Sequence, residues 1–436
     1  MLARQDSSRG RPGFAPQPRR STRRVLAALA LAGCSTAGFA QVGVPLTLAE
    51  AERLALARSP QVAAQRSMAD AAREMAGPAG SLPDPKLIAG FENVPTEGPD
   101  RWRLNRDPMT MTRIGLMQDF PQGEKLRLKS ERATQEAARN DVAAVVAALA
   151  VRREVANAWL ARHYSSRQSR VVAAQVDEVR LQQSTTAALY GAGRASQSDL
   201  LAAQATSIEL ANRATEAALA SERARLALAR LVGAGEADRP LASPPDVLVL
   251  PDAAARLVEV ERQPEILLAQ AQESVLSVDA DVARAGRLPD WSAELTYGIR
   301  GPDFGNMVSL MVRVDLPWTP GTRQDREYAS KLKERDAARA QREDLARSRE
   351  AEVRQMLAEW EAMRVQAVRV RDELVPLAAR RVEAALAAYR GGSGTLAAVL
   401  EARRAELDAR LAQIGFEQSA ARAWAWLSTL LPREGA

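Results

Sequence analysis

Side chains that could carry out catalytic or metal chemistry are few in this chain. Its 436 residues include one histidine, His163, and one cysteine, Cys34. A zinc site or a nucleophile–base pair needs several such groups together, and neither residue has a second histidine or cysteine to act with. The acidic residues are spread along helical stretches, where they are typical of surface and interhelical charge, and no glycine-rich phosphate loop follows a strand. We therefore predict a protein that is not an enzyme and needs no cofactor or bound metal.

Methionines offer one further kind of chemistry. Met109, Met111 and Met117 fall in one short segment, and Met307 and Met311 fall in another. Thioether sulfurs bind soft Cu(I), so methionines on a water-facing surface could relay that ion. Methionine also fills irregular gaps between packed side chains. A metal relay is therefore a hypothesis, and simple packing is its alternative.

The two methionine segments belong to four stretches that alternate with the period of a β-strand. The clearest is 307–316, where Val308, Leu310, Val312 and Val314 face one way; stretches 291–300 and 110–120 alternate similarly, and 86–92 is the weakest. Charged side chains occupy the other face: Arg113, Asp119, Glu294, Arg313 and Asp315. Strands of about ten residues can cross a bilayer at a tilt, with the charged face towards water. A soluble sheet with one buried face would show the same alternation.

Four strands cannot close a barrel on their own. In lipid, open sheet edges would leave backbone hydrogen bonds unsatisfied. Several copies of the chain must therefore pool their strands if the sheet enters a membrane. The strand count requires an oligomer without fixing the number of copies.

The rest of the sequence predicts long helices. Alanine is abundant and aromatic residues make up only 4% of the chain, which favours helices packed closely through small side chains. We expect helices at about 48–76, 126–190 and 196–231, and again at 252–286, 323–389 and 395–430. Thr47 with Glu50 three residues on forms a capping box at the first start. Pro376 should kink the second long helix.

These elements form two tandem copies of one unit. Four short motifs recur in the same order at a nearly constant offset: Ser59-Pro60-Gln61 with Gln263-Pro264-Glu265, Leu82-Pro83-Asp84 with Leu288-Pro289-Asp290, Asp119-Phe120-Pro121 with Asp315-Leu316-Pro317, and Tyr190-Gly191-Ala192-Gly193 with Tyr389-Arg390-Gly391-Gly392. The predicted fold is mostly α with a small β part, each unit being helix, β-hairpin, long helix, turn and helix. We place the first repeat at 46–240 and the second at 241–432.

The N-terminus predicts export. Residues 1–33 hold seven arginines and one acid ahead of a short apolar stretch, which together are typical of a signal peptide. Residues 34–45 would then form a linker or anchor, with Cys34 after Leu31-Ala32-Gly33 as the lipid attachment site; cleavage after Ala40 is the alternative. Without residues 1–33, 53 basic residues balance 53 acidic ones. The chain therefore has no net charge that would attract nucleic acid.

The pattern of two such units behind an export signal resembles the TolC-like outer-membrane efflux family. The segments beginning Leu82-Pro83-Asp84-Pro85 and Met109-Thr110-Met111-Thr112 resemble its heavy-metal RND branch. The resemblance implies a homotrimer in which a 12-stranded transmembrane β-barrel continues into a long periplasmic α-barrel. Such a protein is a passive duct in the outer membrane of a Gram-negative bacterium. It contacts outer-membrane lipid, a periplasmic adaptor and an inner-membrane RND pump, and its cargo would be heavy-metal cations.

The resemblance also implies that the turn between each long helix and the helix that follows it docks the adaptor. The residues concerned are Tyr190, Gly193, Ser196, Asp199, Tyr389, Gly391, Gly392 and Thr395. Turn chemistry alone also explains glycines at these positions. The alternatives for the whole chain are the outer duct of a drug or type I secretion exporter, or a periplasmic coiled-coil scaffold without a barrel.

Overall fold

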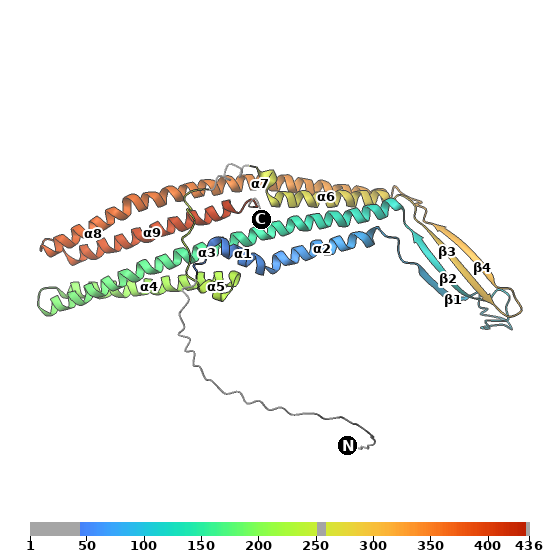
Figure 1. The fold of residues 1–436 in the computed structure, drawn as a ribbon, viewed down its shortest axis with the longest axis horizontal. Coiled ribbons are helices and arrows are strands. Elements are labelled where there is room, and N and C mark those ends of the chain that lie inside the picture. Colours follow the sequence, from blue (N-terminus) through green and yellow to red (C-terminus); the bar gives the residue numbers. More distant parts are fainter. Residues whose placement is uncertain (1–43, 251–258, 433–436) are drawn as a thin grey trace, which may run out of the picture. The chain divides into compact units, whose positions relative to one another are not determined.

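The computed structural model describes residues 44–250 and 259–432. The predicted signal peptide, and Cys34 with most of the linker at 34–45, lie outside the described residues. In the unit that begins at Val44, long helices run beside one another and a small sheet lies beyond one end of them (Figure 1).

The two halves of this unit have the same order of elements. The first comprises α1 (Leu48–Arg58), α2 (Pro60–Gly80), β1 (Lys86–Glu92), β2 (Met111–Phe120), α3 (Gly123–Gly191), α4 (Gln197–Val232) and α5 (Ala234–Asp238). The second comprises η2 (Val260–Arg262), α6 (Pro264–Ala285), β3 (Trp291–Arg300), β4 (Met307–Val314), α7 (Gln324–Arg369), the π-helical turn η3 (Val370–Leu374), α8 (Val375–Arg390) and α9 (Leu396–Ser428). The prediction of a mostly helical chain with a small β part is confirmed.

The first helix of each half begins and ends differently from the prediction. The expected helix at 48–76 is two helices, because Pro60 lacks a backbone N–H and starts α2 after the extended residue Ser59. Pro78 does not end α2, which continues to Gly80. In the second half the described helix begins at Pro264 rather than 252. Thr47 accepts from the Glu50 N–H as predicted, and the Glu50 carboxylate also contacts Arg239.

Proline also interrupts the second long helix, as predicted, and does so through a π turn. The N–H of Val375 donates to the carbonyl of Val370, one residue farther back than in an α-helix. Pro376 follows directly and cannot donate a hydrogen bond. Its counterpart α3 is a continuous helix of 69 residues. The two repeats therefore differ in the middle of their longest helices.

The sheet joins the repeats edge to edge. Its order is β1-β2-β3-β4 with antiparallel pairing throughout. Strands β2 and β3 come from different repeats and pair over ten residues, with Met111 opposite Arg300 and Phe120 opposite Trp291. Strands β1 and β4 are the two edges of the sheet.

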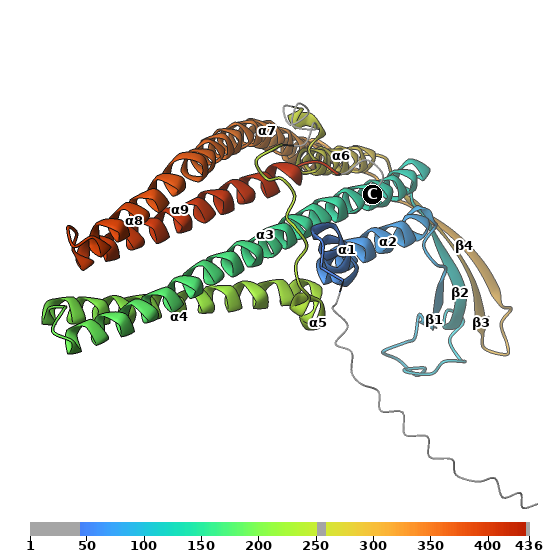
Figure 2. The same ribbon diagram turned by 60° about the vertical axis from the view of Figure 1, so that its left-hand side comes forward.

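The largest cluster of buried apolar side chains lies around α3. Three tryptophans donate hydrogen bonds to the backbone of the segments that precede α1 and follow α5. The indole N–H of Trp159 donates to the Leu46 carbonyl at 3.1 Å. Trp360 and Trp424 donate to the carbonyls of Val247 and Val249 at 2.9 and 3.1 Å. From this region the helical hairpins α3/α4 and α8/α9 extend away from the sheet, with α3 packed against α9 (Figures 1 and 2).

Candidate functional site

The two faces of the sheet differ sharply, and the apolar one is uncovered. The strand register places Leu295 beside Leu116 and Leu310 on this face. Leu310 is 72% exposed, whereas Glu294 and Thr296 on the opposite face are 6% and 3% exposed. On this face, the exposed large apolar side chains are Leu87, Phe91, Ile114, Leu116, Trp291, Leu295, Tyr297, Ile299, Val308, Leu310, Val312 and Val314.

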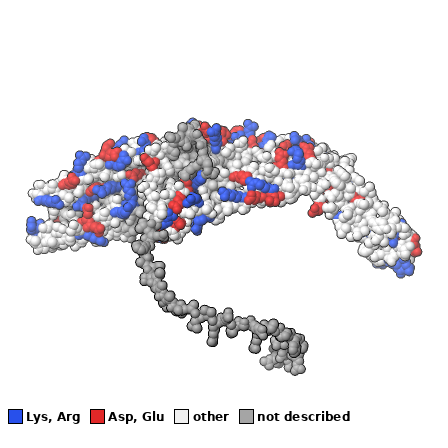
Figure 3. Space-filling view, viewed as in Figure 1, with Lys and Arg blue, Asp and Glu red and all other residues white. Residues whose placement is uncertain are grey.

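This arrangement reverses that of a sheet in a water-soluble domain. There, the apolar face packs against other elements and the polar face meets water. Here, Glu294 and Thr296 on the polar face are buried among their neighbours, while a continuous apolar surface faces outward. An exposed apolar patch spanning four strands marks a surface that meets a lipid or protein partner. In the space-filling view, the part of the sheet nearest the helices is largely uncharged, while both signs mix along the helices (Figure 3).

Paired charges cross the polar face. Glu294 on β3 contacts Arg113 on β2 at 2.7 Å and Arg313 on β4 at 2.9 Å. Arg113 also contacts Glu92 on β1 at 2.9 Å, so the network spans the whole sheet. Because the Glu294 side chain is only 7% exposed, its charge is held by these arginines rather than by water.

Most residues predicted on the charged face lie there, with one correction. Arg113, Asp119, Glu294 and Arg313 share that face by register, and Asp119 contacts Lys86 at 2.7 Å. Asp315 lies after the end of β4, where its backbone N–H donates to the Asp290 carbonyl. The strand ends earlier than the alternating pattern predicted.

Four of the five methionines also lie on the polar face. Register places Met111 and Met117 there on β2, and Met307 and Met311 on β4, whereas Met109 precedes β2. The Arg313 guanidinium lies 3.7 Å from the sulfurs of both Met117 and Met311. A fixed positive charge beside two thioethers opposes cation binding. In the described part of the chain, no group of His, Cys, Asp or Glu side chains could hold a metal ion.

His163 is a packing residue. Its ring stacks on Trp159 with centroids 5.9 Å apart and meets Tyr164 edge-on at 5.1 Å. Burial, together with the nearby positive charges of Arg167 and Arg170, lowers the pKa of His163. The neutral imidazole therefore predominates at neutral pH.

The turn between α3 and α4 is closed by a full capping box. The Ser196 hydroxyl accepts from the Asp199 N–H at 3.1 Å, and the Asp199 carboxylate accepts from the Ser196 N–H at 3.1 Å. Gly193 adopts φ +67°, which favours glycine. Tyr190, in the last turn of α3, is 42% exposed. The Asp199 carboxylate also accepts from the Ser196 hydroxyl at 2.6 Å, and this bond, together with the one from the Ser196 N–H, lowers the pKa of Asp199.

The corresponding turn after α8 requires glycine at Gly392, one of the two predicted positions, and at Gly394, which was not predicted. Gly392 has φ +76°, but Gly391 has ordinary helical angles. Gly394 was missed by sequence reasoning: a Cβ there would lie 2.9 Å from the Tyr389 backbone nitrogen. Thr395 caps α9 by accepting from the Ala398 N–H at 3.2 Å. Turn chemistry therefore accounts for Gly392, and not for Gly391.

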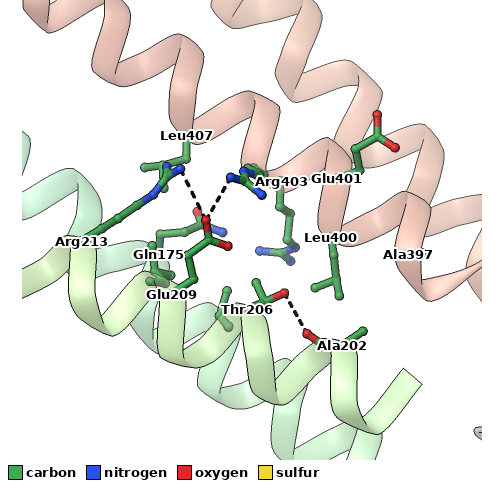
Figure 4. Close-up of a pocket in the computed structure, with 13 residues that line it drawn as sticks. Gln175, Ala202, Thr206, Glu209, Arg213, Ala397, Leu400, Glu401, Arg403 and Leu407 are labelled. Atoms are coloured by element: carbon green, nitrogen blue, oxygen red, sulfur yellow. Dashed lines mark hydrogen bonds and ion pairs between the residues drawn. The ribbon is translucent and has the colours of Figure 1, made fainter. Parts of the chain in front are cut away.

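Ion pairs bridge the two hairpins near these turns. Arg213 on α4 contacts Asp408 on α9 at 2.8 Å, and Arg404 on α9 contacts Glu209 on α4 at 2.9 Å. A groove of about 300 Å³ lies between the hairpins (Figure 4). Its residues are Gln175, Val179, Ala202, Thr206, Glu209, Leu210, Arg213, Ala397, Leu400, Glu401, Arg403, Arg404 and Leu407. Because the side chains of these two ion pairs are partly exposed to water, each pair contributes little to stability.

Among the residues that the structure describes, no helix is both long enough and apolar enough to cross a membrane.

Comparison with known proteins gives one matching family model and several solved structures with a similar fold. The model of the outer membrane efflux protein family matches residues 259–432. No curated protein matches the chain. Among solved structures, a membrane protein from Pseudomonas aeruginosa superposes with a TM-score of 0.76 at 18% identity, covering 88% of this chain and 89% of its own.

Two outer-membrane proteins show the same fold. VceC from Vibrio cholerae has a TM-score of 0.70 at 20% identity, covering 88% of this chain and 95% of its own. The CmeC outer membrane channel from Campylobacter jejuni has a TM-score of 0.73 at 15% identity, covering 88% and 85%. These likenesses show a shared fold.

The family matched by the second half consists of channels, not enzymes, which confirms the prediction of a non-enzymatic protein. The same match and the outer-membrane descriptions of the two structures agree with the predicted location. The matches do not distinguish a heavy-metal branch.

Proposed function

We propose that this chain is the outer-membrane channel of a tripartite efflux pump and acts as a passive exit duct. The observation that carries this proposal is the sheet with an exposed apolar face and an internally paired charged face. Lipid against the first face and a water-filled lumen against the second satisfy both surfaces at once. The residues that would line the lumen are Arg113, Asp119, Glu294 and Arg313, with Asp315 at its helical end.

Closure of the sheet calls for further copies of the chain. Strands β1 and β4 are edges, and edges in lipid would leave their outward N–H and C=O groups unpaired. Three copies would supply the 12 strands implied by the family resemblance, and their helices would form the periplasmic α-barrel. A coiled-coil scaffold without a barrel gives no role to the exposed apolar face.

The turns at the far ends of the hairpins would dock a periplasmic adaptor, which links the duct to an inner-membrane RND pump. Tyr190, Gly193, Ser196 and Asp199 would act from the first hairpin, and Tyr389, Gly391, Gly392 and Thr395 from the second. The π turn before Pro376 interrupts the helix that leads into the α8/α9 hairpin, whereas α3 is continuous. Separation of the hairpins there would open the passage.

The cargo proposed is a heavy-metal cation, and this rests on the sequence resemblance of the two motifs at 82–87 and 109–115. The charged face of the sheet pairs its acids with arginines and lysine, so it has no excess of free carboxylates to select cations. Selectivity would then belong to the pump. A drug or type I secretion exporter remains the alternative for cargo. Cys34 would add a lipid anchor if processed as a lipoprotein signal predicts.

Reconstitution into a planar bilayer tests the channel directly. Purified protein should insert and give discrete conductance steps, and it should fractionate with the outer membrane. Its electrophoretic migration should shift on heating, as a closed barrel unfolds. A protein recovered wholly in the periplasmic fraction, with no bilayer conductance, would contradict the proposal.

Tolerance assays in a strain lacking the gene separate the cargo classes. Loss of growth on copper or other heavy-metal salts, restored by the gene, would support metal export. Unchanged metal tolerance with lost tolerance to hydrophobic drugs would favour the drug exporter instead.

A further inference from the structure

The groove between the two helical hairpins has an apolar floor. It lies between α3 and α4 of the first repeat and α9 of the second, and its volume is about 300 Å³ (Figure 4). Val179, Leu210, Leu400 and Leu407 line it, and each of these side chains is at most 9% exposed. Pockets that hold small molecules are lined mainly by apolar side chains, with a few polar groups that fix the orientation of the ligand. The floor therefore suits the apolar body of a small molecule.

Charged residues surround this floor. Among the described residues that line the groove, the charged ones are Arg213, Arg403, Arg404, Glu209 and Glu401. Both glutamates already contact arginines: Glu209 contacts Arg404 at 2.9 Å, and Glu401 contacts Arg381 at 2.8 Å. Because these carboxylates are paired and the lining has more arginines than acids, the groove favours an anionic ligand over a cationic one.

Arg403 has a donor without an acceptor. Its side chain is 18% exposed, and its Nη1 contacts Glu178 on α3. Its Nε is buried and has no hydrogen-bond acceptor among the residues that the structure describes. Nε and the adjacent Nη2 form the edge of a guanidinium that a carboxylate can contact with two parallel hydrogen bonds. Since a buried donor without an acceptor lowers stability, Arg403 favours a ligand that brings a carboxylate into the groove.

We propose that this groove binds a small amphipathic carboxylate. The carboxylate contacts the Nε edge of Arg403, and the apolar body packs against Val179, Leu210, Leu400 and Leu407. An uncharged or cationic molecule of the same shape fills the floor but gives Arg403 no negatively charged acceptor. One chain builds the whole groove, so the site requires neither a lipid-facing sheet nor an oligomer.

A ligand in this groove contacts both hairpins at once. Leu210 is on α4, whereas Leu400 and Leu407 are on α9. A molecule that binds between two elements stabilises the arrangement in which they lie together, because it binds that arrangement better than a separated one. The bound carboxylate should therefore slow amide exchange in the parts of α4 and α9 that line the groove.

Equilibrium dialysis with naphthylacetate, a fluorescent aryl carboxylate, tests the site. The full chain is held in lipid nanodiscs, and empty nanodiscs give the blank. Naphthylacetate should bind saturably, with one molecule per chain. The matching alcohol and primary amine should bind about tenfold more weakly, because they cannot form the charge-assisted pair with Arg403. Equal binding of the three compounds, or no saturable binding of naphthylacetate above the blank, would overturn the proposal.

Two threonines on α4 provide a matched test of the position. The hydroxyls of Thr206 and Thr215 each donate to the carbonyl four residues earlier, at 2.9 and 3.1 Å. Thr206 lines the groove, whereas Thr215 is exposed outside it. Thr206→Trp should therefore abolish naphthylacetate binding, and Thr215→Trp should leave it unchanged. If both variants bind naphthylacetate equally well, the groove is not the site.

Arg403→Lys tests the guanidinium without altering the floor. The variant keeps a positive charge for Glu178 but lacks the two-donor edge. Naphthylacetate should bind this variant several-fold more weakly, while binding of the matching alcohol should not change. Unaltered naphthylacetate binding by Arg403→Lys would show that Arg403 does not hold the carboxylate, and the proposal would be wrong.

Discussion

Arg113 on β2 contacts Glu294 on β3 at 2.7 Å and so links the two repeats across the middle of the sheet. The two residues are 181 positions apart in the sequence. Their side chains lie on the covered face, while the leucines that alternate with them face outward. The charge network therefore links the strands of the sheet. It also forms the surface that would line a water-filled passage.

We expect Glu294→Gln to destabilise the sheet. The change removes the negative charge that both Arg113 and Arg313 contact, and leaves two guanidinium groups facing each other. The free energy of unfolding should fall by about 2–3 kcal/mol, measured by urea unfolding in detergent. Glu92→Gln is the control: its side chain is 42% exposed, so its cost should stay below about 1 kcal/mol. Equal costs for the two variants would show that the network does not stabilise the sheet.

A charge on the apolar face should prevent membrane assembly. Leu310→Arg places a guanidinium on the exposed apolar surface, whereas Ser309→Arg adds the same group one residue away on the charged face. An arginine in the middle of the lipid-facing band costs about 2–4 kcal/mol. Recovery in the outer-membrane fraction should drop for Leu310→Arg and stay near normal for Ser309→Arg. The reverse ranking would mean that the faces have been assigned wrongly.

The capping box at the first hairpin turn should be sensitive to substitution. Ser196→Ala removes the hydroxyl that accepts from the Asp199 N–H, at a cost of about 1 kcal/mol. The first turn of α4 should then exchange its amide hydrogens faster than in the unaltered protein. Ser196→Thr keeps a hydroxyl and should protect this turn; fast exchange there too would assign the effect to something other than the cap.

The same turn should loosen at low pH. The hydrogen bonds to Ser196 lower the pKa of Asp199 in the folded state. The stabilisation is therefore present above the pKa of an unfolded aspartate, about 3.9, and is lost as the pH falls through the lower folded value. Amide exchange at the start of α4 should rise over that acidic range, and Asp199→Asn should remove the dependence. A flat profile in the unaltered protein would contradict this assignment.

Buried tryptophan should secure the N-terminal segment to α3. Trp159 is fully buried and donates to the Leu46 carbonyl. Trp159→Phe keeps an aromatic ring but loses that hydrogen bond and some volume, and should cost about 1–3 kcal/mol of unfolding free energy. Trp159→Ala should cost about 3–5 kcal/mol. If both variants lost only a small and similar amount of unfolding free energy, Trp159 would not be what secures this segment.

Sequence reasoning succeeded where a strong local pattern decides the structure. Period-two alternation located all four strands within a few residues, and the proline-free run of α3 predicted its length closely. The order of elements followed from the repeated motifs. These are features in which local preference and tertiary environment agree.

Features decided by tertiary contacts were missed. The pattern showed two faces but not which one is covered, because a soluble sheet alternates in the same way. Nothing near Glu50 predicted Arg239 as its partner, since 189 residues separate them. Gly394 was overlooked because its need for glycine comes from a close approach to the backbone at Tyr389, which sequence spacing does not reveal.

Cysteine labelling of neighbouring residues on β4 tests most directly whether the sheet lies in lipid. Leu310 is exposed on the apolar face, and Ser309 is exposed on the charged face. In outer-membrane preparations, Leu310→Cys should react with a lipid-soluble maleimide and resist a charged one, whereas Ser309→Cys should react with the charged reagent entering through the lumen. Equal reaction of both positions with the charged reagent would contradict a lipid-embedded sheet, and with it the account of this protein as a membrane channel.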